Sequence, residues 1–203
     1  MEDKLIFGLG VSGLSALKLL VSQGEKPFVV NSGQPNTWKY YNEAKKLVGE
    51  QRLVSEHEAK EQFLEANEII LSPGIPREHH LLKSIEKEKI INEIELAARF
   101  ISTPLWGITG TNGKTTTVSM AEHLFKSLNL KCFAGGNIGA GLCELVAEKK
   151  HNDFDLIVLE LSSFQLESLF EIKFQYACIL NFSSSHGERY SEVGVLLEYQ
   201  DLK

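Results

Sequence analysis

The chain lacks the features that mark several large classes of protein. No apolar run approaches the roughly 18 residues needed to cross a bilayer, and the first residues, MEDKLIFGLG, show no basic segment before a long apolar stretch. Only three of the 203 residues are cysteines, and they are widely spaced, without a CxxC pair. We therefore expect Cys132, Cys143 and Cys178 to be small core residues in a reducing compartment. We also expect a cytoplasmic protein with no signal peptide and no membrane contact.

An excess of positive charge is also missing. Lys plus Arg number 21 against 27 Asp plus Glu, so the formal net charge is −6. Nonspecific nucleic-acid binding needs basic side chains that neutralise phosphates, and this balance argues against it. The 43% hydrophobic and 24% charged content is that of a folded protein with one large or two small domains.

Short apolar segments alternate with longer stretches of helical period, which predicts an α/β fold with parallel sheets. We expect a Rossmann-like domain over residues 1–100, followed over residues 101–203 by part of a P-loop ATPase-like α/β domain. The last two strands are nearly continuous apolar runs, which predicts cover on both faces. Lys83–Lys89 has the pattern of a mixed-charge helix face. The expected strands are Lys4–Gly8, Pro27–Asn31, Arg52–Ser55, Glu68–Ser72, Leu105–Thr109, Asp155–Leu161 and Tyr176–Asn181. The expected helices are Ser12–Gln23, Asn42–Val48, Glu58–Glu65, Ile91–Phe100, Lys114–Leu128 and Val193–Lys203.

A glycine-rich turn, GLGVSG, occupies Gly8–Gly13 between the first expected strand and helix. Glycines let the backbone approach a phosphate, and the helix N-terminus adds free N–H groups and a positive dipole end. NAD-binding units carry an acidic residue after the second strand, whereas this chain has Asn31-Ser32-Gly33. The motif therefore favours phosphate or nucleotide binding over NAD, and a simple tight turn stays open.

The strongest motif is GTNGKTT at Gly110–Thr116, between the Leu105–Thr109 strand and a helix. It departs from the strict GxxxxGK[ST] template because Ile108 stands at the first glycine position. Backbone N–H groups of such a loop cradle phosphates, Lys114 neutralises them, and the Thr115 hydroxyl ligates Mg²⁺. We predict an ATP site formed by Gly110, Thr111, Asn112, Gly113, Lys114, Thr115 and Thr116.

Glu160 lies at the carboxyl end of a strand that follows this loop. Ligands of open α/β sheets bind outside those strand ends, so Glu160 is a candidate Mg²⁺ ligand beside Thr115. The remaining histidines show no metal-like spacing, and we expect solvated or helix-surface positions for His57, His79, His80, His123 and His151.

Four motifs occur along the chain in this order: SPGIP at Ser72–Pro76, GTNGKTT at Gly110–Thr116, GGNIG at Gly135–Gly139 and LELSSFQLE at Leu159–Glu167. Together they resemble the Mur ligases of peptidoglycan synthesis, and the opening GLGVSGLS is similar to the branch that adds D-glutamate. The resemblance covers nearly the whole chain but only part of the family's length. It implies an N-terminal UDP-sugar domain and the first part of a central ATPase domain, with the family's C-terminal domain absent.

The resemblance implies an ATP-dependent ligase that joins D-glutamate to UDP-N-acetylmuramoyl-L-alanine through an acyl phosphate, using Mg²⁺ or Mn²⁺. Lys114, His186 and Lys203 would be catalytic, Lys203 as a carbamylated lysine. Thr115, Glu160 and His186 would serve the metal. The expected partners are UDP-N-acetylmuramoyl-L-alanine, D-glutamate and ATP. The expected oligomeric state is a monomer. The 203-residue chain alone is expected to be inactive. The implied substrate-binding residues are Val11, Ser12, Asn31, Ser32, Gly74, Asn137, Ser162 and Gln165.

Other functions remain open at this point. A non-catalytic UDP-sugar or nucleotide-binding module is favoured by Ser183-Ser184-Ser185, which stand where the family has acidic or Thr residues. Another ATP-dependent amide ligase of the superfamily, similar to folylpolyglutamate synthase, is disfavoured by the GLGVSGLS domain. An NAD dehydrogenase is disfavoured by Asn31 and by the ATP loop.

Overall fold

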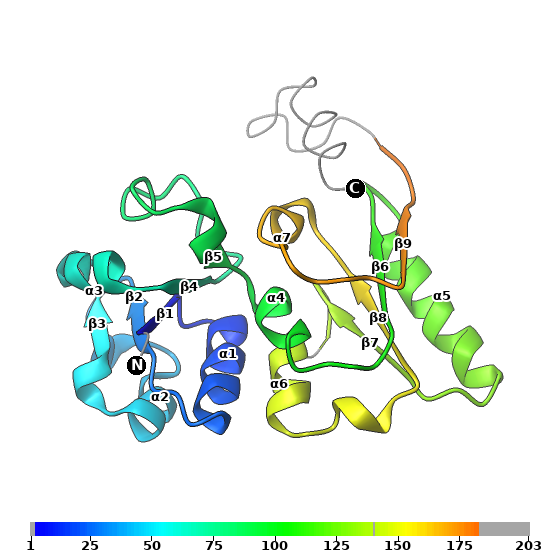
Figure 1. Cartoon of the computed structure of the whole chain (residues 1–203), viewed down its shortest axis with the longest axis horizontal. Coiled ribbons are helices and arrows are strands. Elements are labelled where there is room, and N and C mark those ends of the chain that lie inside the picture. The colour runs from blue at the N-terminus through cyan, green and yellow to red at the C-terminus, as the bar shows by residue number, and fades with distance from the viewer. Residues whose placement is uncertain (1–2, 140, 183–203) are drawn as a thin grey trace.

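The computed structural model describes residues 3–139 and 141–182. They form two parallel β-sheets with helices around them (Figure 1). This α/β architecture with parallel sheets confirms the fold class expected from the sequence. Among the described residues, no helix is long and apolar enough to cross a membrane.

The first sheet has five parallel strands in the order β3-β2-β1-β4-β5. Leu5, Ile6 and Phe7 pair with Phe28, Val29 and Val30 on one side, and β4 pairs along the other side of β1. Each crossover therefore returns the chain in the same direction, and all carboxyl ends of the strands lie at one edge. The strands are β1 (Lys4–Phe7), β2 (Phe28–Asn31), β3 (Leu53–Ser55), β4 (Glu68–Leu71) and β5 (Ile90–Ile91). The helices are α1 (Val11–Ser22), η1 (Pro35–Thr37), α2 (Tyr41–Val48), η2 (Glu50–Arg52), η3 (Glu56–Glu58), α3 (Lys60–Glu65), η4 (Lys87–Lys89) and α4 (Glu93–Ala98).

Within residues 3–139 and 141–182, the second sheet has four parallel strands in the order β7-β8-β6-β9. The inner strand β8 is buried along its whole length, as its apolar sequence predicts. Its strands are β6 (Leu105–Thr109), β7 (Cys132–Gly136), β8 (Leu156–Glu160) and β9 (Tyr176–Ile179). Its helices are α5 (Lys114–Ser127), α6 (Leu142–Ala147), η5 (His151–Asp153) and α7 (Ser163–Leu166).

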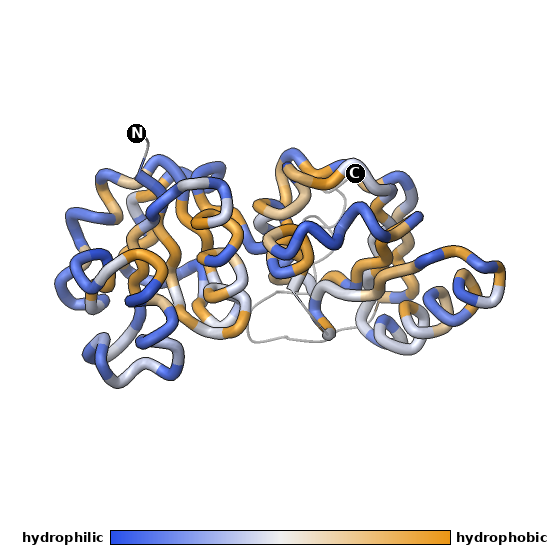
Figure 2. The backbone as a smooth tube through the Cα atoms, turned by 90° about the horizontal axis from the view of Figure 1, so that it is seen from below, coloured by the Kyte–Doolittle hydropathy of each residue, from blue (hydrophilic) through white to orange (hydrophobic). Residues whose placement is uncertain are grey.

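Helices α1, α4 and α6 pack together between the two sheets (Figure 1). Their apolar side chains belong to one continuous core that reaches from Ile6 in β1 to Ile157 in β8. Figure 2 shows the apolar stretches of the trace inside both halves, with hydrophilic stretches around them. Burial of this shared core holds the two sheets together.

A carboxylate lies inside the helix junction. Glu93, at the start of α4, is 6% exposed and accepts a hydrogen bond from the backbone N–H of Cys143 in α6. Burial raises the pKa of the Glu93 carboxyl to about 7 and also raises the pKa of the Cys143 thiol. The junction therefore contains an acid that ionises near neutral pH.

Several expectations about local structure were wrong. The helix predicted from Ile91 begins at Glu93, because Ile90 and Ile91 pair with β4 as a fifth strand and Asn92 caps the helix. The strand predicted to be covered on both faces is an exposed edge strand: β9 has β6 as its only strand neighbour within the described ranges, and Cys178 is exposed rather than part of the core. The range 83–89 contains only the short η4 helix.

Candidate functional site

The turn after β1 is shaped by three glycines with different surroundings. Gly8 has a φ of +98°, and a Cβ there would lie 2.7 Å from the Ser72 Cβ atom. A Cβ on Gly13 would lie 1.9 Å from the carbonyl oxygen of Gly8, so α1 packs directly against the turn. A Cβ on Gly10 would meet no atom within 4 Å. Gly8 and Gly13 are therefore explained by packing, whereas Gly10 leaves open space at the N-terminus of α1.

Five of the residues expected to bind the substrate lie at this turn or on the segments beside it: Val11, Ser12, Asn31, Ser32 and Gly74. Val11, the first residue of α1, is 62% exposed although it is apolar. The Ser72 hydroxyl donates to the Gly8 carbonyl (2.8 Å), which ties the SPGIP loop to the turn, and Gly74 of that loop faces open space. Ser32 accepts a hydrogen bond at its carbonyl from the Trp38 indole (2.8 Å), which fixes the loop after β2. Parallel strands bring these loops to the same edge of the sheet.

The SPGIP segment also contacts the second half of the chain. The Arg77 guanidinium donates to the Glu167 carbonyl (2.6 Å), and the Asn92 amide donates to the Gln165 carbonyl (2.6 Å). A small pocket between these segments is lined from both sides, by residues that include Ser72, Pro73 and Phe164. Two motifs far apart in the sequence, SPGIP and LELSSFQLE, are thus neighbours.

The phosphate loop connects β6 to α5. Gly110 and Gly113 have φ values of +145° and +85°, which L side chains rarely adopt. The Lys114 ammonium folds over the loop and donates to the carbonyls of Gly110 (2.7 Å) and Thr111 (3.1 Å). The loop thus holds a positive charge against the N-terminus of a 14-residue helix, an arrangement that suits a polyphosphate.

Glu160, at the end of β8, is 2% exposed, and three groups approach it. The Thr115 hydroxyl donates to one carboxylate oxygen (2.7 Å) and the Asn137 amide donates to the other (3.0 Å). The Asn137 backbone N–H also donates to the Glu160 carbonyl (2.9 Å). A Cβ on Gly136 would lie 2.3 Å from that carbonyl oxygen, so the close approach of β7 and β8 requires glycine.

The donor set at this position fits a hard divalent cation. Mg²⁺ binds oxygen ligands in octahedral geometry at 2.0–2.1 Å, so adjacent ligands lie about 2.9 Å apart. The Thr115 and Glu160 oxygens are 2.7 Å apart and adjoin the phosphate loop. These two residues are therefore the candidates to hold Mg²⁺ beside a nucleotide phosphate.

Asn181 contacts the phosphate loop, although the sequence did not predict a role for it at this site. Asn181, which follows β9, accepts from the Asn112 backbone N–H at its side-chain oxygen (2.9 Å) and donates to the Asn112 carbonyl (2.8 Å). Its own carbonyl accepts from the Thr111 N–H (3.3 Å). Asn181 thereby fixes the phosphate loop. The available signal was a polar residue at the end of an expected strand, the same signal that pointed to Glu160.

The other assigned residues divide into two groups. Ser162 and Gln165 form a reciprocal cap of α7: the Ser162 N–H donates to the Gln165 side-chain oxygen (2.9 Å), and the Gln165 N–H to the Ser162 hydroxyl (3.3 Å). Ser162 and Gln165 therefore stabilise the start of α7, and they also lie close to Asn92 and the SPGIP loop. His186, Lys203, the Ser183–Ser185 segment and the helix expected over Val193–Lys203 lie outside the described residues.

Two family comparisons match the two halves of the chain. Residues 2–92 match the family described as "Mur ligase MurD-like, N-terminal domain". Residues 108–198 match the "Mur ligase middle domain". The first range includes the glycine turn and SPGIP, and the second includes the phosphate loop and Glu160.

Curated relatives extend the comparison over nearly the whole chain. Proteins named UDP-N-acetylmuramoylalanine–D-glutamate ligase are 38% identical in Thermoanaerobacter sp. (strain X514) and 36% identical in Geotalea uraniireducens, over 98% of this chain in both cases. The chain spans 43% of the length of each of these relatives. A Neisseria crystal structure, of UDP-N-acetylmuramate:L-alanyl-gamma-D-glutamyl-meso-diaminopimelate ligase, has the same fold over the full chain and 67% of its own, with a TM-score of 0.54 and 15% identity.

Proposed function

The chain belongs to the Mur ligase family, whose N-terminal and middle domains it carries, and on this premise we propose that it supplies the substrate-binding and ATP-binding parts of a D-glutamate ligase. The proposed reaction joins D-glutamate to UDP-N-acetylmuramoyl-L-alanine with ATP. The observation that carries the proposal is the group formed by Lys114, Thr115 and Glu160 at one sheet edge. We assign residues 1–100 to the UDP-sugar domain and residues 101–203 to the ATP-binding domain.

ATP solves a chemical problem in this reaction, because a carboxylate is a poor acyl donor. In the proposed route the L-alanine carboxylate of the substrate takes the γ-phosphoryl group, which gives an acyl phosphate and ADP. The D-glutamate amine then attacks the carbonyl carbon, and phosphate leaves as the amide forms and the nitrogen loses its proton. Positioning and charge neutralisation supply most of the catalysis in such a phosphoryl transfer.

The residues of this chain have distinct parts in that scheme. Lys114 exchanges its contacts with the Gly110 and Thr111 carbonyls for oxygens of the ATP phosphates. Thr115 and Glu160 would hold Mg²⁺, which when bound neutralises charge on the transferred phosphoryl group. Asn137 orients the Glu160 carboxylate and faces the muramoyl part of the substrate.

The UDP moiety is proposed to bind at the first sheet. The diphosphate lies at the open side of Gly10 and the first turn of α1, beside Val11 and Ser12, where backbone N–H groups and the helix dipole favour an anion. Asn31 at the end of β2, with Ser32 and Gly74 on the adjoining loops, holds the uridine. Hydrogen bonds from Arg77 and Asn92 to the α7 segment hold the SPGIP loop close to the second sheet. This proximity supports a substrate that extends from one sheet toward the other.

Nucleotide binding tests the proposal directly. We expect the 203-residue chain to bind ATP with Mg²⁺, and we expect Lys114→Ala to weaken that affinity at least about 10-fold, since charge-assisted hydrogen bonds to phosphate are lost. Lys126→Ala is the matched control, because Lys126 lies in the last turn of the same helix and pairs with Glu122. Equal affinity of the parent and Lys114→Ala would contradict the proposal.

Turnover gives a separate test. We assign no D-glutamate-binding residue to this chain, so we expect no D-glutamate-dependent phosphate release from the purified 203 residues. A release that requires both D-glutamate and UDP-N-acetylmuramoyl-L-alanine would contradict this expectation.

A further inference from the structure

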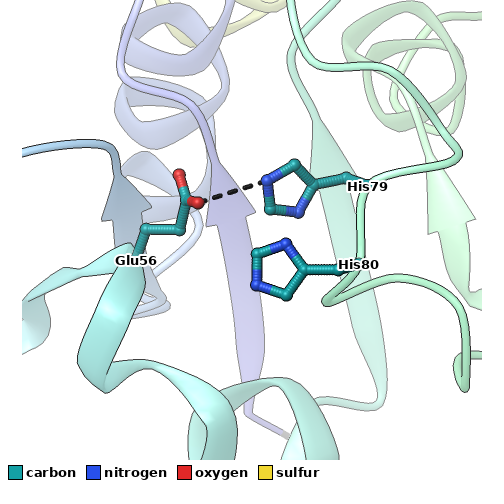
Figure 3. A group of neighbouring side chains, drawn as sticks. All are labelled: Glu56, His79 and His80. Atoms are coloured by element: carbon teal, nitrogen blue, oxygen red, sulfur yellow. Dashed lines mark ion pairs between the residues drawn. The ribbon is translucent and has the colours of Figure 1, made fainter.

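Two histidines and a carboxylate converge at the first sheet, apart from the phosphate loop. They are Glu56, His79 and His80, called here the Glu56–His cluster (Figure 3). Glu56 comes from η3, directly after β3, and the histidines follow the SPGIP loop. Their ligand atoms all lie within 4.8 Å of one another. Figure 3 shows the Glu56 side chain facing the His79 and His80 rings.

The cluster is positioned by the fold. The His79 ring packs edge-on against Phe7, the last residue of β1 (5.0 Å between ring centroids), and lies 4.5 Å from the His80 ring. The turn that carries both rings is closed by backbone hydrogen bonds from His79 N to Pro76 O (3.1 Å) and from Leu82 N to His79 O (2.8 Å). Leu82 is buried in the core beside β1 and β4. Packing against Phe7 and hydrogen bonds within the turn therefore hold the histidines in place beside η3.

The separation of the donors suits a tetrahedral metal ion. The Glu56 Oε1 and His79 Nε2 atoms are 3.2 Å apart. Zinc binds histidine nitrogen and carboxylate oxygen at about 2.0–2.2 Å, so two ligands on a tetrahedral zinc lie about 3.3 Å apart. Both side chains are mostly shielded, with 16% of Glu56 and 19% of His79 exposed, whereas His80 is exposed and free to adjust.

We propose that Glu56, His79 and His80 bind a divalent transition-metal ion of the zinc class, with three protein ligands and an open fourth position. Imidazole nitrogens select this class over Mg²⁺ or Ca²⁺, which prefer oxygen-only sites. A metal at Nε2 of His79 leaves the ring proton on Nδ1. The long contact from the Leu81 N–H to Nδ1 (3.4 Å) is then given up, a small loss beside a metal bond. The ion fastens the segment after SPGIP to the turn after β3.

Zinc titration of the metal-free chain tests the site, with Co²⁺ absorption as a report on tetrahedral coordination. We expect one ion per chain in the parent, and at least about 10-fold weaker binding in Glu56→Gln, His79→Ala and His80→Ala, because each removes a ligand. His57→Ala is the matched control: His57 lies in the same η3 turn, is exposed and stands outside the cluster, so its binding should equal the parent's.

Thermal unfolding separates binding from folding. Zinc should raise the Tm of the parent and of His57→Ala but not that of His80→Ala, whose exposed ring contributes little to the core. Binding no tighter than about 10 μM in the parent would overturn the proposal, given the affinities of protein zinc sites. Equal affinity in the parent and the three cluster variants would also overturn it.

Discussion

The Thr115 hydroxyl donates a 2.7 Å hydrogen bond to the Glu160 carboxylate, across 45 residues of sequence. Thr115 lies in the first turn of the helix after the phosphate loop, and Glu160 is the last residue of β8, an inner strand of the second sheet. The contact joins the phosphate-binding element to an acidic oxygen ligand. It is the structural basis for the metal and ATP roles proposed for this half of the chain.

Removal of the Thr115 hydroxyl should weaken the contribution of Mg²⁺ to nucleotide binding. We expect Thr115→Val to reduce the Mg²⁺-dependent gain in ATP affinity by about 10-fold, since one oxygen ligand is lost. Thr117→Val is the control, because its hydroxyl donates to the Gly113 carbonyl on the same helix without reaching Glu160. Titrations of ATP with and without Mg²⁺ measure the effect. An unchanged Mg²⁺ dependence in Thr115→Val would remove this residue from the metal site.

Two of the three glycines at the turn after β1, Gly10 and Gly13, should respond differently to substitution by alanine. Gly13→Ala places a Cβ 1.9 Å from the Gly8 carbonyl oxygen and should lower the free energy of unfolding by about 3 kcal/mol, the range of overpacking changes. Gly10→Ala meets no atom and should cost about 1 kcal/mol or less as a poorer N-cap. Gly10→Ala should nevertheless weaken UDP-sugar binding, because the methyl group occupies the proposed diphosphate space. Urea unfolding and ligand titration distinguish the effects; similar stability losses in both variants would contradict the packing account.

The buried acid at the helix junction should make stability depend on pH. The folded-state pKa of Glu93 is about 7, above its ordinary value of 4.5, so the folded state binds the proton more tightly. The stability that this group contributes is full below pH 4.5, falls as the pH rises toward 7 and is lost above it. Ionisation should cost about 3 kcal/mol over that interval.

Glu93→Gln tests this directly, because the amide keeps an acceptor for the Cys143 N–H and does not ionise. The variant should be more stable than the parent at pH 8 and should lose the slope between pH 4.5 and 7. Glu144→Gln, on α6 but 38% exposed, serves as the control and should keep the slope, slightly reduced because the Glu144 charge adds to the rise of the Glu93 pKa. An identical pH profile for Glu93→Gln and the parent would show that the junction tolerates the charge.

The sequence predicted the parts of the site that depend on local pattern. The strand Leu105–Thr109 was assigned with its observed bounds, and the position of Glu160 followed from the rule that parallel strands end at one edge. The strand β7 was missed, because the two glycines in CFAGG weaken a β pattern. The sequence pattern assigns Ile91 of β5 to the following helix, because the two residues of this strand are defined by pairing with β4 rather than by composition.

The hydropathy pattern of the sequence does not predict contacts between segments that are distant along the chain. The hydrogen bonds between Asn181 and Asn112 depend on the register of β9 with β6. The burial of Glu93 depends on how α4 and α6 cross, and the convergence of Glu56 with His79 joins two loops at one sheet edge. Histidine spacing alone indicates no metal site, because the third proposed ligand is a carboxylate, Glu56, 23 residues before His79.

We propose that the first domain recognises a UDP-sugar rather than a dinucleotide. Calorimetric titration of the 203-residue chain with UDP-N-acetylmuramoyl-L-alanine, and separately with NAD, distinguishes these two ligands. We predict binding of the UDP-sugar and no heat from NAD, since Asn31 stands where NAD-binding units carry an acidic residue. Binding of NAD without binding of the UDP-sugar would contradict the account.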